Sequence, residues 1–157
     1  MMMLLTMGSA TAWADSVTFN LANSSQNISA QNGGTLIYTA TVSTSGNAAP
    51  VFLNGDSFNV STPITLDDTD FFANFPFTLN TTDSFTGDLF TLNIPAGAAP
   101  GTYYGSFSLL GGADGGSSDL LGTVNYSVTV TPEPSSFLLF GTGLSALVGV
   151  VRSKRRS

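Results

Sequence analysis

The chain has 157 residues, with all four basic residues in its last six positions and every Asp between residues 15 and 119. A body that carries carboxylates and no basic side chain cannot neutralise a phosphate backbone, so nucleic-acid binding is excluded. There is no Cys and no His; disulfides and thiolate metal sites are therefore excluded, and we expect no cofactor.

Residues 1–14 form an apolar stretch that ends in small side chains. Ala12 and Ala14 flank Trp13 in the A-x-A pattern that signal peptidase requires, so we expect a signal peptide over residues 1–14 with cleavage before Asp15. A secretory signal also needs a basic n-region, which this stretch lacks, and we therefore expect the true start to lie upstream of Met1. The alternative is a short unstructured lead with a chance A-x-A pattern.

Residues 15–131 have the size of one domain that can bury a core. Short β-branched and aromatic runs recur there between Gly, Pro, Asn and Asp clusters, and no segment has helical periodicity. We expect turns at residues 54–56 and 86–88, because both contain Gly beside Asn or Asp. The predicted strands are residues 16–22, 35–43, 51–53 with 57–60, 64–66, 71–79, 89–94, 103–110 and 120–130.

The last third of this domain gives the clearest strand pattern. Apolar side chains alternate with polar ones from Val124 to Val130, as in a strand with one buried face. Residues 94–104 resemble the corner before the penultimate strand of bacterial immunoglobulin-like domains, where a Tyr hydrogen-bonds back to the preceding loop; Tyr103 or Tyr104 would fill this role. We expect an all-β fold, an immunoglobulin-like two-sheet antiparallel β-sandwich, followed by a single C-terminal transmembrane helix.

Residues 132–157 have three parts, each with a physical reason. Pro132, Glu133 and Pro134 favour an extended, accessible peptide, because proline fixes the backbone and removes donors. Residues 135–151 carry no charge and are just long enough to cross a bilayer as a helix. The basic cluster that follows stays on the cytoplasmic side by the positive-inside bias, which places the β domain outside. This cluster consists of Arg152, Lys154, Arg155 and Arg156.

This ending resembles the PEP-CTERM sorting signal of envelope and exopolysaccharide-associated proteins in Gram-negative bacteria. By that resemblance Pro132, Glu133 and Pro134 form the recognition motif of exosortase, a membrane protease, and processing takes place near it. The resemblance also implies a link to exopolysaccharide and biofilm. The alternative is a plain single-pass tail anchor.

Catalytic groups are scarce in the body of the chain. Without His there is no base of the Ser-His type, and Cys, Lys and Arg are missing as well. Only a paired-carboxylate mechanism such as glycoside hydrolysis remains, and a domain of this size without Trp offers poor material for the cleft that such an enzyme needs. We therefore expect no enzymatic activity.

Two other features of the sequence could bind a ligand, calcium in one case and a sugar in the other. Asp67, Asp68 and Asp70 in one loop, or Asp114 and Asp119 in another, could ligate calcium, but neither group has a calcium-loop spacing. We expect solvated turn carboxylates there, because Asp is a favoured turn residue. Sugar could bind an aromatic patch in the Phe-rich stretch, although such density is more typical of a core. The stretch contains Phe71, Phe72, Phe75 and Phe77.

Together these features predict an exported, non-catalytic protein that is transiently anchored in the inner membrane and then reaches the cell surface or extracellular matrix of a Gram-negative bacterium. Its expected partners are the membrane, an exosortase-type protease and exopolysaccharide. The alternative function is a carbohydrate- or calcium-binding module on the same sandwich, and a glycosidase is a remote third.

Overall fold

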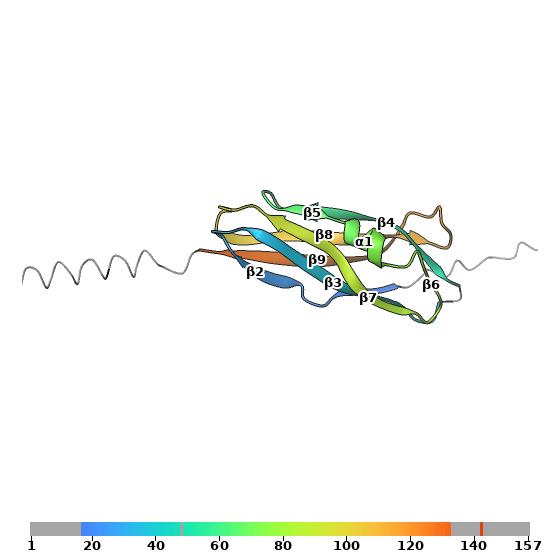
Figure 1. Ribbon diagram of the computed structural model, residues 1–157. Coiled ribbons are helices and arrows are strands. Elements are labelled where there is room, and N and C mark those ends of the chain that lie inside the picture. The colour runs from blue at the N-terminus through green and yellow to red at the C-terminus, as the bar shows by residue number, and fades with distance from the viewer. Residues whose placement is uncertain (1–16, 48, 133–141, 143–157) are drawn as a thin grey trace, which may run out of the picture.

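The structure, a computed structural model, describes residues 17–47, 49–132 and 142. Two β-sheets pack face to face, and one short helix lies beside them (Figure 1). The first sheet has the strand order β1 (Val17–Leu21), β3 (Gly34–Thr44), β7 (Ser84–Ile94) and β5 (Thr65–Asp67). The second sheet has the order β2 (Ser25–Ser29), β9 (Asp119–Thr131), β8 (Gly101–Gly112), β4 (Val51–Val60) and β6 (Thr78–Leu79).

The connectivity is that of an immunoglobulin-like sandwich. Strands β1, β3, β7 and β5 follow the A-B-E-D order, while β4, β8 and β9 follow the C-F-G order of the opposite sheet. All pairings are antiparallel among the described strands except that of β2 with β9, which is parallel. The predicted all-β sandwich is confirmed, whereas the structure describes only Thr142 of the predicted transmembrane helix.

Strand β2 was not predicted, because its sequence Ser-Gln-Asn-Ile-Ser has almost no apolar alternation. The two predicted turns at residues 54–56 and 86–88 are wrong, since both lie inside continuous strands. At Asn54 and Leu89 one extra residue interrupts the register, so each site is a β-bulge. The bulge at Leu89 places two consecutive side chains, Leu89 and Phe90, in the core with no exposed surface.

The predicted strand over residues 71–79 is also wrong, because most of it forms α1 (Thr69–Asn74) and the loop that leads to β6. Phe71 and Phe75 are buried, whereas Phe72 and Phe77 are exposed. The spacing of four residues between Phe71 and Phe75 is a helical signal that the dense run of Phe obscured. The expectation that this stretch fills the core therefore holds for only two of its four rings.

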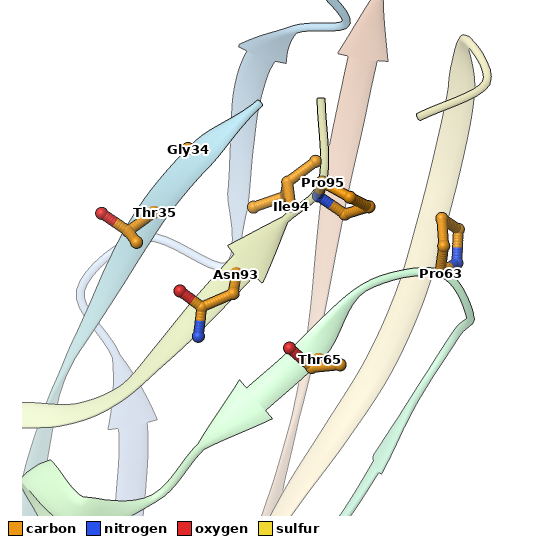
Figure 2. Close-up of a pocket in the computed structure, with 7 residues that line it drawn as sticks. All are labelled: Gly34, Thr35, Pro63, Thr65, Asn93, Ile94 and Pro95. Carbon is orange, nitrogen blue, oxygen red and sulfur yellow. The ribbon is translucent and has the colours of Figure 1, made fainter. Parts of the chain in front are cut away.

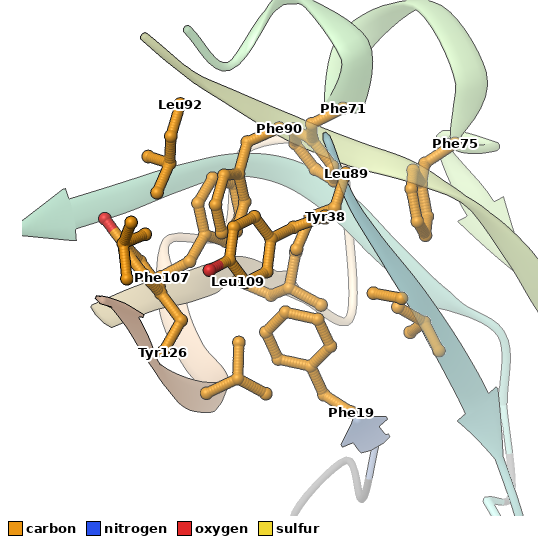
Figure 3. Packing of buried hydrophobic residues seen from close by; sticks show 14 of the residues in the cluster. Phe19, Tyr38, Phe71, Phe75, Leu89, Phe90, Leu92, Phe107, Leu109 and Tyr126 are labelled. Atoms are coloured by element: carbon orange, nitrogen blue, oxygen red, sulfur yellow. The ribbon is translucent and has the colours of Figure 1, made fainter. Parts of the chain in front are cut away.

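Stacked aromatic rings form the centre of the core (Figure 3). The ring of Phe90 stacks on Tyr38 at a centroid distance of 4.9 Å and on Phe107 at 5.2 Å. Tyr126 packs against Phe90 and fills the space left by Gly105, where an added Cβ would clash with the tyrosine ring. The Tyr38 hydroxyl donates to the Ser127 carbonyl (3.0 Å), and the Tyr126 hydroxyl donates to the Asn59 carbonyl (3.2 Å), so both buried phenols are hydrogen-bonded.

Candidate functional site

The C-terminal segment leaves the sandwich from the end of β9, which is held on both sides. Strand β8 pairs with β9 along one edge, and β2 pairs with its last residues along the other. The Ala30 amide donates to the Thr131 carbonyl (3.0 Å), and the Thr131 hydroxyl donates to the Ile28 carbonyl (3.2 Å). The chain is therefore fixed to the fold up to Thr131 and exposed at the next residue, Pro132.

Of the predicted site residues, the structure describes only Pro132. It directly follows the last residue of β9 and is exposed, as an accessible recognition peptide requires. Glu133 and Pro134 lie outside the described residues, as do the signal-peptidase positions Ala12 and Ala14. The basic cluster also lies outside them: Arg152, Lys154, Arg155 and Arg156. No helix in the described ranges is long and apolar enough to cross a membrane.

A tyrosine corner closes the crossover between the sheets, as the sequence predicted. The Tyr103 hydroxyl donates to the Ala99 carbonyl at 2.8 Å, four residues back in the β7–β8 loop. Tyr104 points outward and is 67% exposed. The choice that the sequence left open is therefore resolved in favour of Tyr103.

The candidate calcium loops use their carboxylates to hold turns. Asp67 accepts hydrogen bonds from the Thr69 hydroxyl (2.6 Å) and amide (3.0 Å), which lower the pKa of its carboxyl. Asp114 accepts from the Gly116 amide (2.8 Å) and the Ser117 hydroxyl (3.0 Å), with the same effect on its pKa. Within residues 17–47 and 49–132 no group of three acidic, His or Cys side chains is arranged to hold a metal ion.

Asp56 is a titratable group that the sequence did not single out. It lies opposite Leu109, a fully buried core residue, so its side chain points toward the inner side of β4. Burial, and secondarily the negative charge of Asp68, raise the pKa of Asp56 to about 6. A pattern of sequence spacing could not reveal this, because Asp56 and Asp68 come together only in the fold.

A shallow hollow lies at the end of the first sheet (Figure 2). Its volume is about 370 Å³, and its lining carries no charge. Thr35, Asn93 and Thr65 share one register row across β3, β7 and β5, and Pro63 and Pro95 flank that row. The hollow therefore combines hydroxyl and amide groups with apolar ring surfaces.

The next rows of the same sheet differ, because their polar side chains bond to one another. The Thr39 hydroxyl donates to Asp88 (2.9 Å), and the Thr91 hydroxyl donates to Asp70 (2.8 Å). The hydroxyls of Thr41 and Thr86 lie 2.7 Å apart. In the part of the chain that the structure describes, the row at the hollow has no such internal bond, so its donors and acceptors remain open to a ligand.

A comparison with protein families matches the PEP-CTERM protein-sorting motif to residues 130–156. The chain thus carries this sorting motif on an immunoglobulin-like β-sandwich, and the motif begins where β9 ends. The motif marks an exported protein that is processed at the membrane. A comparison with characterised proteins finds no sequence match.

Several solved structures share the general architecture at low identity. A member of the MSP family from C. elegans, WR4, is 10% identical with a TM-score of 0.46, and the match covers 72% of this chain and 97% of that one. A non-cellulosomal cohesin from the archaeon Archaeoglobus fulgidus is 9% identical with a TM-score of 0.39, covering 78% and 96%. A family 123 glycoside hydrolase from Clostridium perfringens is 17% identical with a TM-score of 0.41; the match covers 74% of this chain but only 28% of the hydrolase.

Proposed function

We propose that the chain is a non-catalytic cell-surface or matrix protein of a Gram-negative bacterium, held briefly in the inner membrane by residues 135–151 and then processed by an exosortase-type protease. The observation that carries this proposal is the position of the sorting motif. It starts at the last residues of a strand that is paired on both edges, and Pro132 is exposed directly after it. A protease can therefore reach the motif without unfolding the sandwich.

The chemistry of the sandwich supports a non-catalytic body. Residues 15–131 contain no His, Cys, Lys or Arg, and the carboxylates Asp67, Asp70 and Asp114 are engaged in structural hydrogen bonds. The hollow in Figure 2 is lined by Thr, Asn, Pro, Gly and Ile and presents no acid or base. General acid–base catalysis needs a group of suitable pKa within hydrogen-bond reach of the reacting atoms. Asp56, with a pKa of about 6, is on the inner side of β4 and does not line the hollow.

The test replaces Pro132, Glu133 and Pro134 by Ala in a host that has the protease. We expect the full-length form to accumulate in the membrane fraction, because the motif is removed while the fold, which ends at Thr131, is left intact. The matched control is Asp119→Ala, which removes a carboxylate at the start of the same strand and should be released normally. Release of the motif variant at the normal rate would show that the tail is a plain anchor.

We propose exopolysaccharide as the second partner, on the strength of the hollow at Thr35, Asn93 and Thr65. Hydroxyl and amide side chains both donate and accept, which suits sugar hydroxyls, and two proline rings offer apolar surface to the sugar ring. The lining lacks any basic side chain, so the ligand would be a neutral glycan.

A glycan array that includes neutral and acidic polysaccharides tests this second partner. The full chain is presented in a detergent without a sugar headgroup, so that the detergent cannot occupy the hollow. Asn93→Ala should weaken binding of a neutral glycan about tenfold, because one or two hydrogen bonds are lost. Thr18→Val, at an exposed position on the same face of β1, is the control. Binding that is unchanged by Asn93→Ala would refute the site.

A further inference from the structure

The link between the sandwich and the proposed membrane span is very short. Strand β9 ends at Thr131, and the uncharged stretch begins at Ser135. The three residues between them reach at most about 10 Å when fully extended. One end of the sandwich is therefore held within roughly a Debye length of the lipid headgroups. This premise rests on the membrane span of the proposed function.

The end from which the segment leaves, here called the tail end, carries no charge. It consists of the β2–β3, β4–β5 and β7–β8 loops, residues 30–33, 61–64 and 95–100, which lie together in Figure 1. In the first sheet the carboxylate nearest to the tail end is Asp67. It pairs with Thr91, which lies three residues before the end of β7, so Asp67 is roughly 10 Å from the β7–β8 loop. In the second sheet the nearest carboxylate is Asp56, which lies four residues before the end of β4 and thus roughly 13 Å from the β4–β5 loop; its side chain points toward the inner side of the sheet.

The outer faces of the two sheets also differ in charge. The first sheet presents Asp67 and Asp88 in its outward rows, and Asp70 lies against Thr91 of the same face. The outward residues of the second sheet alternate with its buried ones and are all uncharged. They include Ser25, Asn27, Ser29, Ser57, Asn59, Thr102, Tyr104, Ser106, Ser108, Thr123, Asn125, Ser127, Thr129 and Thr131 and, beyond the β-bulges, Phe52, Leu110 and Leu120.

Of the other described carboxylates, Asp68 directly follows Asp67 and precedes α1, and the remaining three lie far from the tail end. Asp114 and Asp119 belong to the β8–β9 hairpin, and Asp83 lies in the turn before β7, where its carbonyl accepts from the Thr44 amide (2.9 Å). These sites are at the opposite end of the sandwich (Figure 1). The uncharged surface is thus continuous from the tail end over the outer face of the second sheet.

An anionic bilayer repels the outer face of the first sheet more strongly than that of the second, because only the first carries carboxylates. At a surface potential of about −30 mV, each carboxylate brought within a Debye length is disfavoured about threefold. If the first sheet faced the membrane, Asp67, Asp70 and Asp88 would lie close to the lipid headgroups, and the population of this orientation would fall about 30-fold. If the second sheet faced the membrane, its outward side chains would place no carboxylate there. We infer that the tail end and the outer face of the second sheet form the side turned toward an anionic lipid surface, with the first sheet and α1 facing away.

Site-specific labels test this orientation, and the absence of Cys makes single labels unambiguous. Asn125→Cys places a fluorophore on the outer face of the second sheet, and Ile37→Cys places one on the outer face of the first, at a side chain that is 53% exposed. The full chain is reconstituted into vesicles of phosphatidylcholine and phosphatidylglycerol that contain a headgroup quencher. We expect the label at position 125 to be quenched much more strongly than the label at position 37, and the difference to shrink in pure phosphatidylcholine.

Isosteric Asn→Asp substitutions then test the charge argument. For this test the label is moved to Ser106→Cys on the same face. Asn27→Asp together with Asn125→Asp adds two carboxylates to that face and should reduce the preference for the second sheet facing the membrane about tenfold. Asn20→Asp adds a carboxylate to the outer face of the first sheet, where Asn20 pairs with Thr41, and should strengthen the preference about threefold instead of weakening it.

Equal quenching at the two positions in a chain that floats with the vesicles would overturn the inference and leave the membrane span standing. A chain that does not float would overturn both. An undiminished preference in pure phosphatidylcholine would show that charge is not the cause. Shielding of position 125 at high protein concentration without vesicles would assign that face to a second copy of the chain instead.

Discussion

Asp56 gives the sandwich a defined dependence on pH. Burial and the neighbouring Asp68 raise its pKa from 3.8 to about 6 in the folded state. Ionisation of Asp56 therefore opposes folding: the penalty is absent below pH 3.8, grows between pH 3.8 and about 6, and is complete above pH 6. Because the side chain is only half-buried, solvent screening reduces the full penalty to about 1 kcal/mol.

Asp56→Asn should remove this penalty. Urea unfolding at several pH values should find the variant about 1 kcal/mol more stable than the wild type at pH 7 and equal to it near pH 4. A difference in free energy of unfolding that does not change between pH 4 and pH 7 would contradict the assignment.

Tyr103 and Tyr104 offer a comparison between adjacent residues of the same type. Tyr103→Phe removes the hydrogen bond to the Ala99 carbonyl and should lower the free energy of unfolding by about 1 kcal/mol. Tyr104→Phe removes a hydroxyl from an outward, exposed ring and should change it by less than about 0.5 kcal/mol. Denaturant titrations of both variants measure the difference, and equal effects would mean that the tyrosine corner does not stabilise the crossover.

At the scale of elements, sequence patterns predicted the strands that have one buried face. The predicted strand over residues 120–130, which alternates cleanly from Val124 onward, corresponds to most of β9, and residues 35–43 correspond to most of β3. The failures have physical causes. Strand β2 is polar and depends on parallel pairing with a strand distant in sequence, and the Gly-containing segments of β4 and β7 lie within strands whose β-bulges absorb an extra residue.

Candidate site residues could be predicted only where they are contiguous in the sequence. The sorting motif is continuous in sequence, so the resemblance found it. The hollow joins Thr35, Thr65 and Asn93 from three strands, and no spacing along the chain predicts that row. The same holds for Asp56, whose altered pKa arises from tertiary burial.

Helix α1 provides a test at this scale. Phe71 lies 6.1 Å from Phe107 between ring centroids and is buried, so Phe71→Ala should cost about 3–5 kcal/mol. Phe72 is 48% exposed, and Phe72→Ala should cost about 1 kcal/mol. Thermal and denaturant unfolding of the two variants measures the difference. Similar losses would mean that α1 does not seal the core through Phe71.

For the whole molecule, the basic cluster determines the predicted topology. A cytoplasmic reporter fused after Ser157 should be active, and a periplasmic reporter fused there inactive, because Arg and Lys are retained on the cytoplasmic side. Replacing Arg152, Lys154, Arg155 and Arg156 by Ser should reduce this asymmetry without affecting the fold, which ends before them. Periplasmic activity of the fusion with the intact cluster would contradict the topology.

The pairing of β9 on both edges has a mechanical consequence. A pull on the C-terminal segment enters the sandwich along β9, whose hydrogen bonds to β2 and β8 run across the strand. Such a load shears these bonds together, whereas a pull at right angles would open them one after another. A pull on this segment is therefore resisted by two hydrogen-bond ladders at once.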